Sequence, residues 1–191
     1  MGMLTAAVVG THGVGKTSIV HEIGKKKPHW LVLEEAVRTV MPSLEYADAY
    51  QFVEKEGIAA LEFLLLGRWG LLEYKHWYCQ RASDNVLLLD SSPWENLAYY
   101  YLLRTPREKK HEKTLNQLAY RAASKIDVYL LVEQGVCEFT EDRLRTKNMQ
   151  ENHEQWLRKV MADAGIEPII LSEVSVDDRT EEVIGILEGN R

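Results

Sequence analysis

The chain has 191 residues and a mass of 22.0 kDa, which is enough for one sizeable hydrophobic core and short for two, so we expect a single domain over residues 1–191. Hydrophobic residues make up 46% of it and charged residues 27%, a globular balance that excludes a disordered chain. The formal net charge of −6 and the pI of 5.6 argue against nucleic acid as a partner, because a general basic surface is missing.

The cysteine content and the length of the apolar runs exclude further classes of protein. Cys79 and Cys137 are too few for a disulfide framework, and nothing resembling a signal peptide precedes the first apolar run, so we expect a reduced, cytoplasmic protein. The longest apolar stretch, residues 58–66, carries Glu62 and is shorter than the roughly 20 residues of a membrane-spanning helix. We therefore expect no membrane partner. His76 lies three residues before Cys79, but no second ligand pair completes a zinc site.

The N-terminal segment combines an apolar strand with a glycine-rich loop. Residues 4–9 predict a buried strand, and residues 10–17 that follow have the sequence GTHGVGKT. In this GxxxxGK[ST] pattern glycines turn backbone N–H groups toward phosphates, the lysine reaches the β- and γ-phosphoryl oxygens and the threonine hydroxyl ligates Mg²⁺. Residues 16–23 predict a helix whose N-terminus adds partial positive charge. The residues predicted to bind a nucleoside triphosphate are Gly10, His12, Gly13, Val14, Gly15, Lys16, Thr17 and Ser18.

Charged side chains follow the second predicted strand, residues 30–33. On a helix that begins there, Glu35 and Arg38 lie three residues apart and share a face, so together they can hold a sugar hydroxyl or a phosphate of a substrate. The alternative is a surface ion pair, and the spacing alone does not separate the two interpretations.

Residues 50–82 predict two helices or one bent helix, and residues 86–89 predict the third strand. Asp90 at the end of that strand gives a Walker-B-like pattern, in which the carboxylate holds Mg²⁺ through water or accepts a proton from an attacking hydroxyl. The alternative is an ordinary strand-end residue. Most aromatic residues in this part are interpreted as core, but Arg68 and Trp69 are placed toward the substrate pocket.

The C-terminal half continues the alternation of strands and helices. Strands are predicted at 126–132 and 168–171, and helices at 94–103, 114–124, 150–164 and 177–187, the last with Asp177 as a cap. This alternation predicts a mostly parallel sheet covered on both faces, with the nucleotide beyond the carboxyl ends of the strands.

Two basic segments lie in the same half. Arg143 and Arg145 can neutralise charge during phosphoryl transfer if residues 141–147 close over a phosphate site, the alternative being a solvated helix start. Residues 104–113 are interrupted by Glu108 and Glu112 and are interpreted as a solvated turn.

In chain order the phosphate loop, the EAVR sequence at 35–38, Asp90 and the late arginines resemble P-loop kinases of small metabolites, above all the nicotinamide-riboside-kinase-like ATPases, with thymidylate and deoxynucleoside kinases as relatives. Residues 139–145 are similar to the family's lid, residues 176–179 look like the start of its final helix, and Arg68 with Trp69 resembles an acceptor-site pair of thymidylate kinases. The resemblance implies a five-stranded parallel sheet of order 2-3-1-4-5, helices on both faces, a lid, and transfer of the γ-phosphoryl group of ATP to a hydroxyl or phosphate.

Two departures from the family pattern leave the acceptor open. Ser91 follows Asp90 where thymidylate and deoxynucleoside kinases usually carry arginine, and Arg68 and Gly70 stand near positions where riboside-kinase-like members have glutamine. Fold alone does not supply a substrate.

We therefore predict a Mg²⁺-dependent kinase that uses ATP, with GTP left open, and a small nucleoside- or nucleotide-like acceptor. The catalytic candidates are Lys16, Glu35, Asp90, Arg143 and Arg145, the acceptor-binding candidates are Glu35, Arg38, Arg68 and Trp69, and the metal ligands are Thr17 and Asp90. One alternative is a regulatory NTPase whose nucleotide state switches a partner interface. Another is a kinase of a nucleic-acid end or modified base, and the oligomeric state, a homodimer included, stays open.

Overall fold

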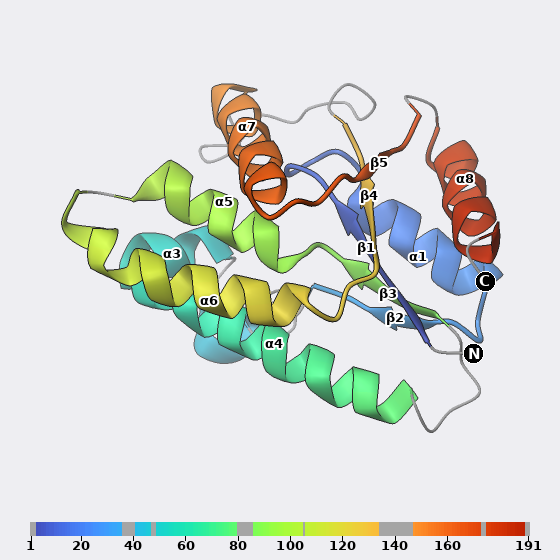
Figure 1. The fold of residues 1–191 in the computed structure, drawn as a ribbon, viewed down its shortest axis with the longest axis horizontal. Coiled ribbons are helices and arrows are strands. Elements are labelled where there is room, and N and C mark those ends of the chain that lie inside the picture. The colour runs from blue at the N-terminus through green and yellow to red at the C-terminus, as the bar shows by residue number, and fades with distance from the viewer. Residues whose placement is uncertain are drawn as a thin grey trace.

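One parallel β-sheet forms the centre of the protein (Figure 1). The computed structural model describes residues 3–35, 41–46, 49–79, 86–104, 106–133, 147–172 and 175–189. The strands are β1 (Leu4–Val9), β2 (Leu31–Leu33), β3 (Val86–Asp90), β4 (Val128–Leu131) and β5 (Ile169–Ile170). They pair in parallel in the order β2-β3-β1-β4-β5, which confirms the predicted order 2-3-1-4-5 and the α/β fold class.

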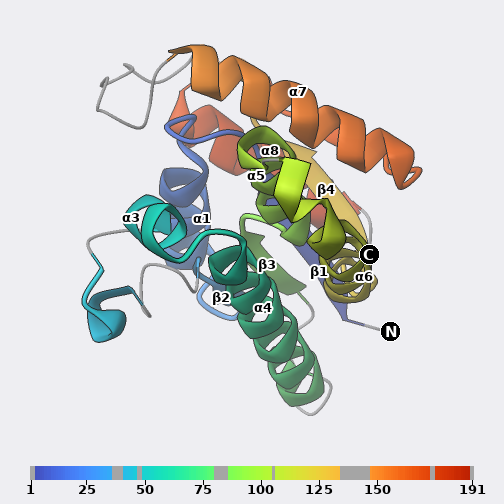
Figure 2. The ribbon, with the colours of Figure 1, turned by 90° about the vertical axis from the view of Figure 1, so that its left-hand side faces the viewer.

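Helices cover both faces of the sheet (Figures 1 and 2). One face carries α1 (Lys16–Lys26) and α8 (Val176–Gly189), and the other carries α4 (Ile58–Cys79), α5 (Pro93–Leu103), α6 (Glu112–Ala123) and α7 (Lys147–Asp163). Strand β1 shows why both faces must be covered. Ala6 and Val8 belong to the core under α1 and α8, whereas Ala7 and Val9 belong to the opposite core. Because side chains alternate along a strand, an uninterrupted apolar strand needs a helical layer on each side.

The predicted helical region 50–82 consists of two helices, α3 (Ala49–Glu56) and α4. The break falls at Gly57, whose φ of 62° lies in the left-handed region that glycine favours at helix ends. Two 3-10 helices, η1 (Met41–Leu44) and η2 (Pro106–His111), complete the described elements. Within the described ranges, no helix is both long and apolar enough to cross a bilayer.

The predicted cap of the last helix is wrong. Helix α8 begins at Val176, so Asp177 lies inside its first turn, and the Oγ atom of Ser175 accepts a hydrogen bond from the Asp178 backbone N–H at 3.2 Å. Serine accepts such a bond readily, and the two aspartates then add negative charge beside the positive end of the helix dipole. Strand β1 has the predicted bounds, and the ends of the other strands differ from the predicted ones by at most two residues.

Candidate functional site

The phosphate loop lies between β1 and α1, at the carboxyl edge of the sheet. Gly13 and Gly15 have φ values of 78° and 91°, in the left-handed region where other residues are strained. At Gly10 a Cβ atom would lie 2.5 Å from the carbonyl oxygen of Val132, so a larger residue does not fit against the end of β4. The three glycines of the pattern are thus required by the backbone that this loop adopts.

The Lys16 side chain folds back over its own loop. Its Nζ atom donates to the carbonyl oxygens of Gly10 and Thr11, both at 2.8 Å, and lies 3.3 Å from Oε2 of Glu95. The side chain is buried. A buried ammonium with three oxygen partners avoids the desolvation cost that an unpaired charge would pay.

Thr17 and Asp90 meet at the end of β3. The Oγ1 atom of Thr17 donates a hydrogen bond to Oδ2 of Asp90 at 2.7 Å. Both side chains offer hard oxygen donors, and Mg²⁺ in nucleotide sites takes few protein ligands because it keeps waters and phosphate oxygens. The two residues therefore fit the predicted metal. Among the described residues, no group of three or more His, Cys, Asp or Glu side chains is arranged to hold a metal ion.

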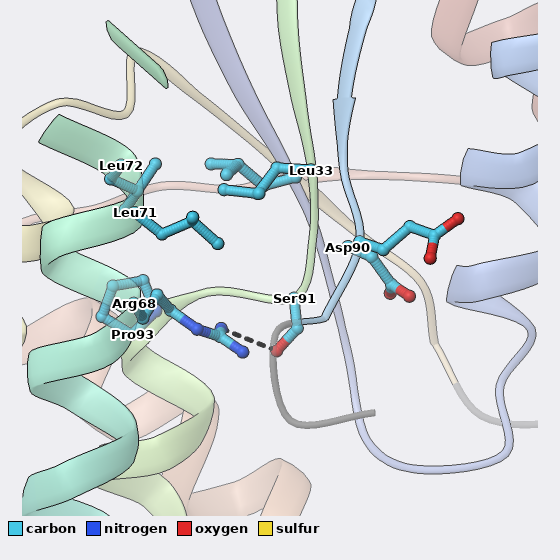
Figure 3. Close-up of a pocket in the computed structure, with 9 residues that line it drawn as sticks. Leu33, Arg68, Leu71, Leu72, Asp90, Ser91 and Pro93 are labelled. Carbon is cyan, nitrogen blue, oxygen red and sulfur yellow. Dashed lines mark hydrogen bonds between the residues drawn. The ribbon is translucent and has the colours of Figure 1, made fainter. Parts of the chain in front are cut away.

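A small pocket, partly open to solvent, adjoins Asp90. It is lined by Leu33, Glu34, Arg68, Leu71, Leu72, Leu89, Asp90, Ser91 and Pro93. Figure 3 shows Arg68 reaching from α4 toward Ser91, to which its Nη1 atom donates at 3.0 Å. The Nη2 atom of Arg68 lies 3.8 Å from Oε1 of Glu35, so these two predicted residues come together next to the cavity.

One predicted acceptor residue that the structure describes, Trp69, does not join this group. Trp69 does not line the cavity: its Nε1 atom donates to Glu73 at 3.2 Å, and the guanidinium of Arg121 on α6 lies 5.7 Å from its ring centroid. Successive helix residues point about 100° apart, and on α4 the Arg68 side chain faces the cavity whereas the Trp69 side chain faces α6. Arg38, Arg143 and Arg145 lie outside the described residues.

Glu95 is a site residue that the sequence interpretation missed. It forms a capping box at the start of α5, where the Ser92 backbone N–H donates to Oε1 of Glu95 at 3.2 Å. Burial raises the pKa of the Glu95 carboxyl, while the nearby charges of Lys16 and Arg68 oppose the rise. The sequence signal was available as the S-x-x-E pattern that follows Asp90, which predicts a helix start at the carboxyl end of β3.

Helix α7 contacts the phosphate loop through the side chain of Gln150. Gln150 Nε2 donates to the carbonyl oxygen of His12 at 2.5 Å, and the His153 ring stacks on Tyr99 with centroids 3.9 Å apart. Burial lowers the pKa of His153 to about 3, so its imidazole is neutral. The helix that follows residues 134–146 is therefore attached directly to the nucleotide-binding loop.

A family model described as an AAA domain matches residues 5–179, and the chain belongs to this AAA-domain family. No curated protein sequence gives a match. Together with the strand order and the glycine-rich loop, this membership defines a P-loop protein.

Solved structures share the fold at low identity. A NadR protein in complex with NAD and AMP-PNP has a TM-score of 0.74 at 13% identity, over 98% of this chain and 49% of that one, so the chain spans about half the length of NadR. Deoxyadenosine kinase from M. mycoides with bound dATP has a TM-score of 0.68 at 16% identity, over 97% and 99% of the two chains. Thymidylate kinase from Ehrlichia chaffeensis has 0.61 at 14%, over 98% and 100%. These likenesses show a fold shared with nucleoside and nucleotide kinases.

Proposed function

We propose that this protein is a kinase that transfers the γ-phosphoryl group of ATP to a nucleoside- or nucleotide-like acceptor in the cavity beside Asp90. One observation carries the proposal: Asp90 accepts a hydrogen bond from Thr17 of the phosphate loop and also lines the cavity that contains Arg68. An acceptor there lies next to the metal and the γ-phosphoryl group, and such proximity is what in-line transfer requires.

On the nucleotide side, Lys16 binds the β- and γ-phosphoryl oxygens, and the loop residues His12, Val14 and Ser18 with the glycines surround the phosphates. Thr17 and Asp90 would hold Mg²⁺, which would supply positive charge beside the phosphoryl oxygens. The NadR and deoxyadenosine kinase structures contain AMP-PNP and dATP, which supports an adenine nucleotide here.

On the acceptor side, Arg68 and Glu35 bind a hydroxyl or a phosphate, while Leu33, Leu71 and Leu72 form an apolar wall against the flat face of a sugar or base (Figure 3). The acceptor oxygen forms a bond to the γ-phosphorus as the bond to the bridging oxygen of ADP breaks. The acceptor proton passes to a carboxylate, either Asp90 or Glu35. We assign Arg38 to the same acceptor and Arg143 and Arg145 to the developing phosphoryl charge.

The cavity favours a kinase over a regulatory NTPase, because a nucleotide-dependent switch needs no second cavity at the metal carboxylate. The net charge of −6 speaks against a nucleic-acid acceptor. We propose a single P-loop domain for residues 1–191.

A phosphoryl-transfer screen tests the proposal. The protein is incubated with Mg²⁺ and γ-labelled ATP, and nucleosides, nucleoside monophosphates and dinucleotides are offered in turn. We expect label on one acceptor class and its loss in Glu35→Gln, whose ATP affinity stays within about twofold of the parent. Hydrolysis of ATP without labelling of any acceptor would favour the regulatory NTPase instead.

A further inference from the structure

Lys16 already has an anionic partner where a triphosphate must bind. Its ammonium lies 3.3 Å from Oε2 of Glu95, and the two residues are 8% and 5% exposed. A lysine in this loop pattern pairs with the β- and γ-phosphoryl oxygens when a nucleotide binds. Glu95 and the triphosphate therefore compete for the same ammonium group.

Glu95 is held so that it cannot follow Lys16. Its Oε1 atom accepts a hydrogen bond from the Ser92 backbone at the start of α5, and its carbonyl oxygen lies 3.3 Å from Nε2 of His153 on α7. The Ser91 hydroxyl, which accepts from Arg68, lies close enough to Glu95 to favour the charged form of that carboxyl. Besides its ion pair with Lys16, the carboxyl group of Glu95 is acted on by the charges of Arg68 and Glu35.

We propose that Glu95 is a positioning residue that holds Lys16 against the loop carbonyls before nucleotide binds and lowers the affinity for triphosphates by competing for that lysine. The inference rests on the proposed function only in that the loop binds a triphosphate. When Lys16 moves to the phosphates, Arg68 is the other cation among the described residues whose charge acts on Glu95, so occupation of the loop changes the charge balance at the acceptor cavity.

A purely structural capping role predicts different behaviour. Glu95→Gln keeps an oxygen that accepts from the Ser92 N–H but removes the negative charge. If Glu95 only caps α5, this variant binds nucleotides like the parent. If Glu95 competes for Lys16, triphosphate affinity rises.

Calorimetry without metal or acceptor separates the two roles. We expect Glu95→Gln to bind ATP on the order of tenfold more tightly, because a hydrogen bond to a charged partner no longer has to be broken. AMP affinity should stay within about twofold, since its single phosphate does not reach the lysine. Glu112→Gln is the matched control: Glu112 begins α6 and pairs with Arg104, away from the loop, and its loss should change neither affinity.

A double-mutant cycle assigns the effect to Lys16. In a Lys16→Ala background, Glu95→Gln should give no gain in ATP affinity. An equal gain there, or a folded Glu95→Gln protein with parental ATP affinity, overturns the inference. Glu95→Asp keeps the negative charge but shortens the side chain by one methylene, so it should give a smaller gain in ATP affinity. It replaces the glutamine variant in this test if that variant does not fold.

The same measurements separate this inference from the proposed function. A parent protein that binds ATP and follows the predicted cycle, yet labels no acceptor, contradicts the kinase proposal and leaves the role of Glu95 intact. Acceptor phosphorylation by the parent, together with unchanged ATP affinity in a folded Glu95→Gln protein, contradicts the inference alone.

Discussion

At the scale of single residues, a few buried polar side chains each contact two parts of the site. Asp90 accepts from Thr17 of the phosphate loop and lines the cavity, and Glu95 pairs with Lys16 of the loop and accepts from the Ser92 N–H at the start of α5. Such groups are buried with partners because an unpaired polar group in the interior is costly. A substitution of Asp90 should therefore change the rate of phosphoryl transfer, and a substitution of Glu95 should change the affinity for ATP.

Asp90→Asn keeps the shape of the side chain and removes its charge. We expect kcat for phosphoryl transfer to fall about 100-fold or more, because the residue either holds Mg²⁺ or accepts the acceptor proton. Nucleotide affinity measured without metal should change little. Turnover equal to that of the parent would make Asp90 a strand-end residue and move its role to Glu35.

Arg68→Gln tests the cavity as the acceptor site. The variant removes a buried guanidinium that bonds Ser91, and we expect KM for the acceptor to rise about tenfold or more while KM for ATP changes less. Arg121→Gln removes an exposed arginine beside Trp69 and should leave both constants unchanged. Equal effects of the two substitutions would argue that the acceptor binds elsewhere.

His153 should make the fold sensitive to mild acid. The folded state keeps it neutral with a pKa of about 3, whereas the unfolded chain has the ordinary value of 6.5, so the unfolded state binds more protons between these values. The free energy of unfolding should therefore fall below pH 6.5, by up to about 1.4 kcal/mol per pH unit.

Urea unfolding between about pH 7 and pH 5 measures this loss, and His153→Phe should remove it while keeping the stack on Tyr99. The raised pKa of Glu95 has the opposite effect, because it stabilises the folded state as the pH falls, and it is present in both proteins. The difference between the parent and the variant in the slope of unfolding free energy against pH therefore comes from His153. If the free energies of unfolding of the two proteins depend equally on pH, His153 takes up protons equally in the folded and unfolded states and folding does not lower its pKa.

At the scale of elements, helix starts place the functional side chains. Helix α1 begins at Lys16, α5 begins directly after the end of β3, and α8 begins after Ser175. The capping box of α5 is both a helix start and the support for Glu95. The capping preferences at helix ends thus determine where the residues of the loop and the cavity lie.

The cap of α8 can be tested apart from the site. Ser175→Ala removes the side chain that accepts from the Asp178 N–H and should lower the free energy of unfolding by about 1 kcal/mol. Ser124→Ala, at the exposed C-terminal end of α6, should change it by less than about 0.5 kcal/mol. Equal stability of the Ser175 variant and the parent would show that the cap contributes nothing measurable.

At the scale of the whole molecule, the parallel sheet brings the carboxyl ends of β1, β2 and β3 to one edge. The phosphate loop follows β1, Glu34 and Glu35 follow β2, and Asp90 ends β3. Helix α7 is attached to the same edge through Gln150. A ligand that binds there contacts segments from most of the chain and should stabilise the folded state as a whole.

Thermal unfolding with nucleotide measures this coupling. Mg²⁺ and ATP at about 100 times the dissociation constant should stabilise the parent by about 2.7 kcal/mol, because the ligand binds only the folded state. Lys16→Ala at the same concentrations should lose most of that shift. An equal shift in the variant would place the nucleotide away from the loop.

The sequence by itself determined the features that depend on residues close together along the chain. The apolar strands, the phosphate loop, the carboxylate at the end of β3 and the helical character of residues 50–82 follow from periodicity and from residue types at fixed spacing, whereas the break into two helices was left open. The order of the strands came from the family resemblance, because strand adjacency in a parallel sheet is not written in any one segment.

Tertiary structure alone decided which side chains meet. Arg68 faces the cavity and Trp69 faces α6 because α4 packs with one orientation between its neighbours, and a rotation by one residue would exchange them. Gln150 reaches His12 across 138 positions of sequence, and Glu95 reaches Lys16 from the start of another helix. Contacts of this kind depend on how packed layers align, and the spacing within one segment carries no information about that alignment.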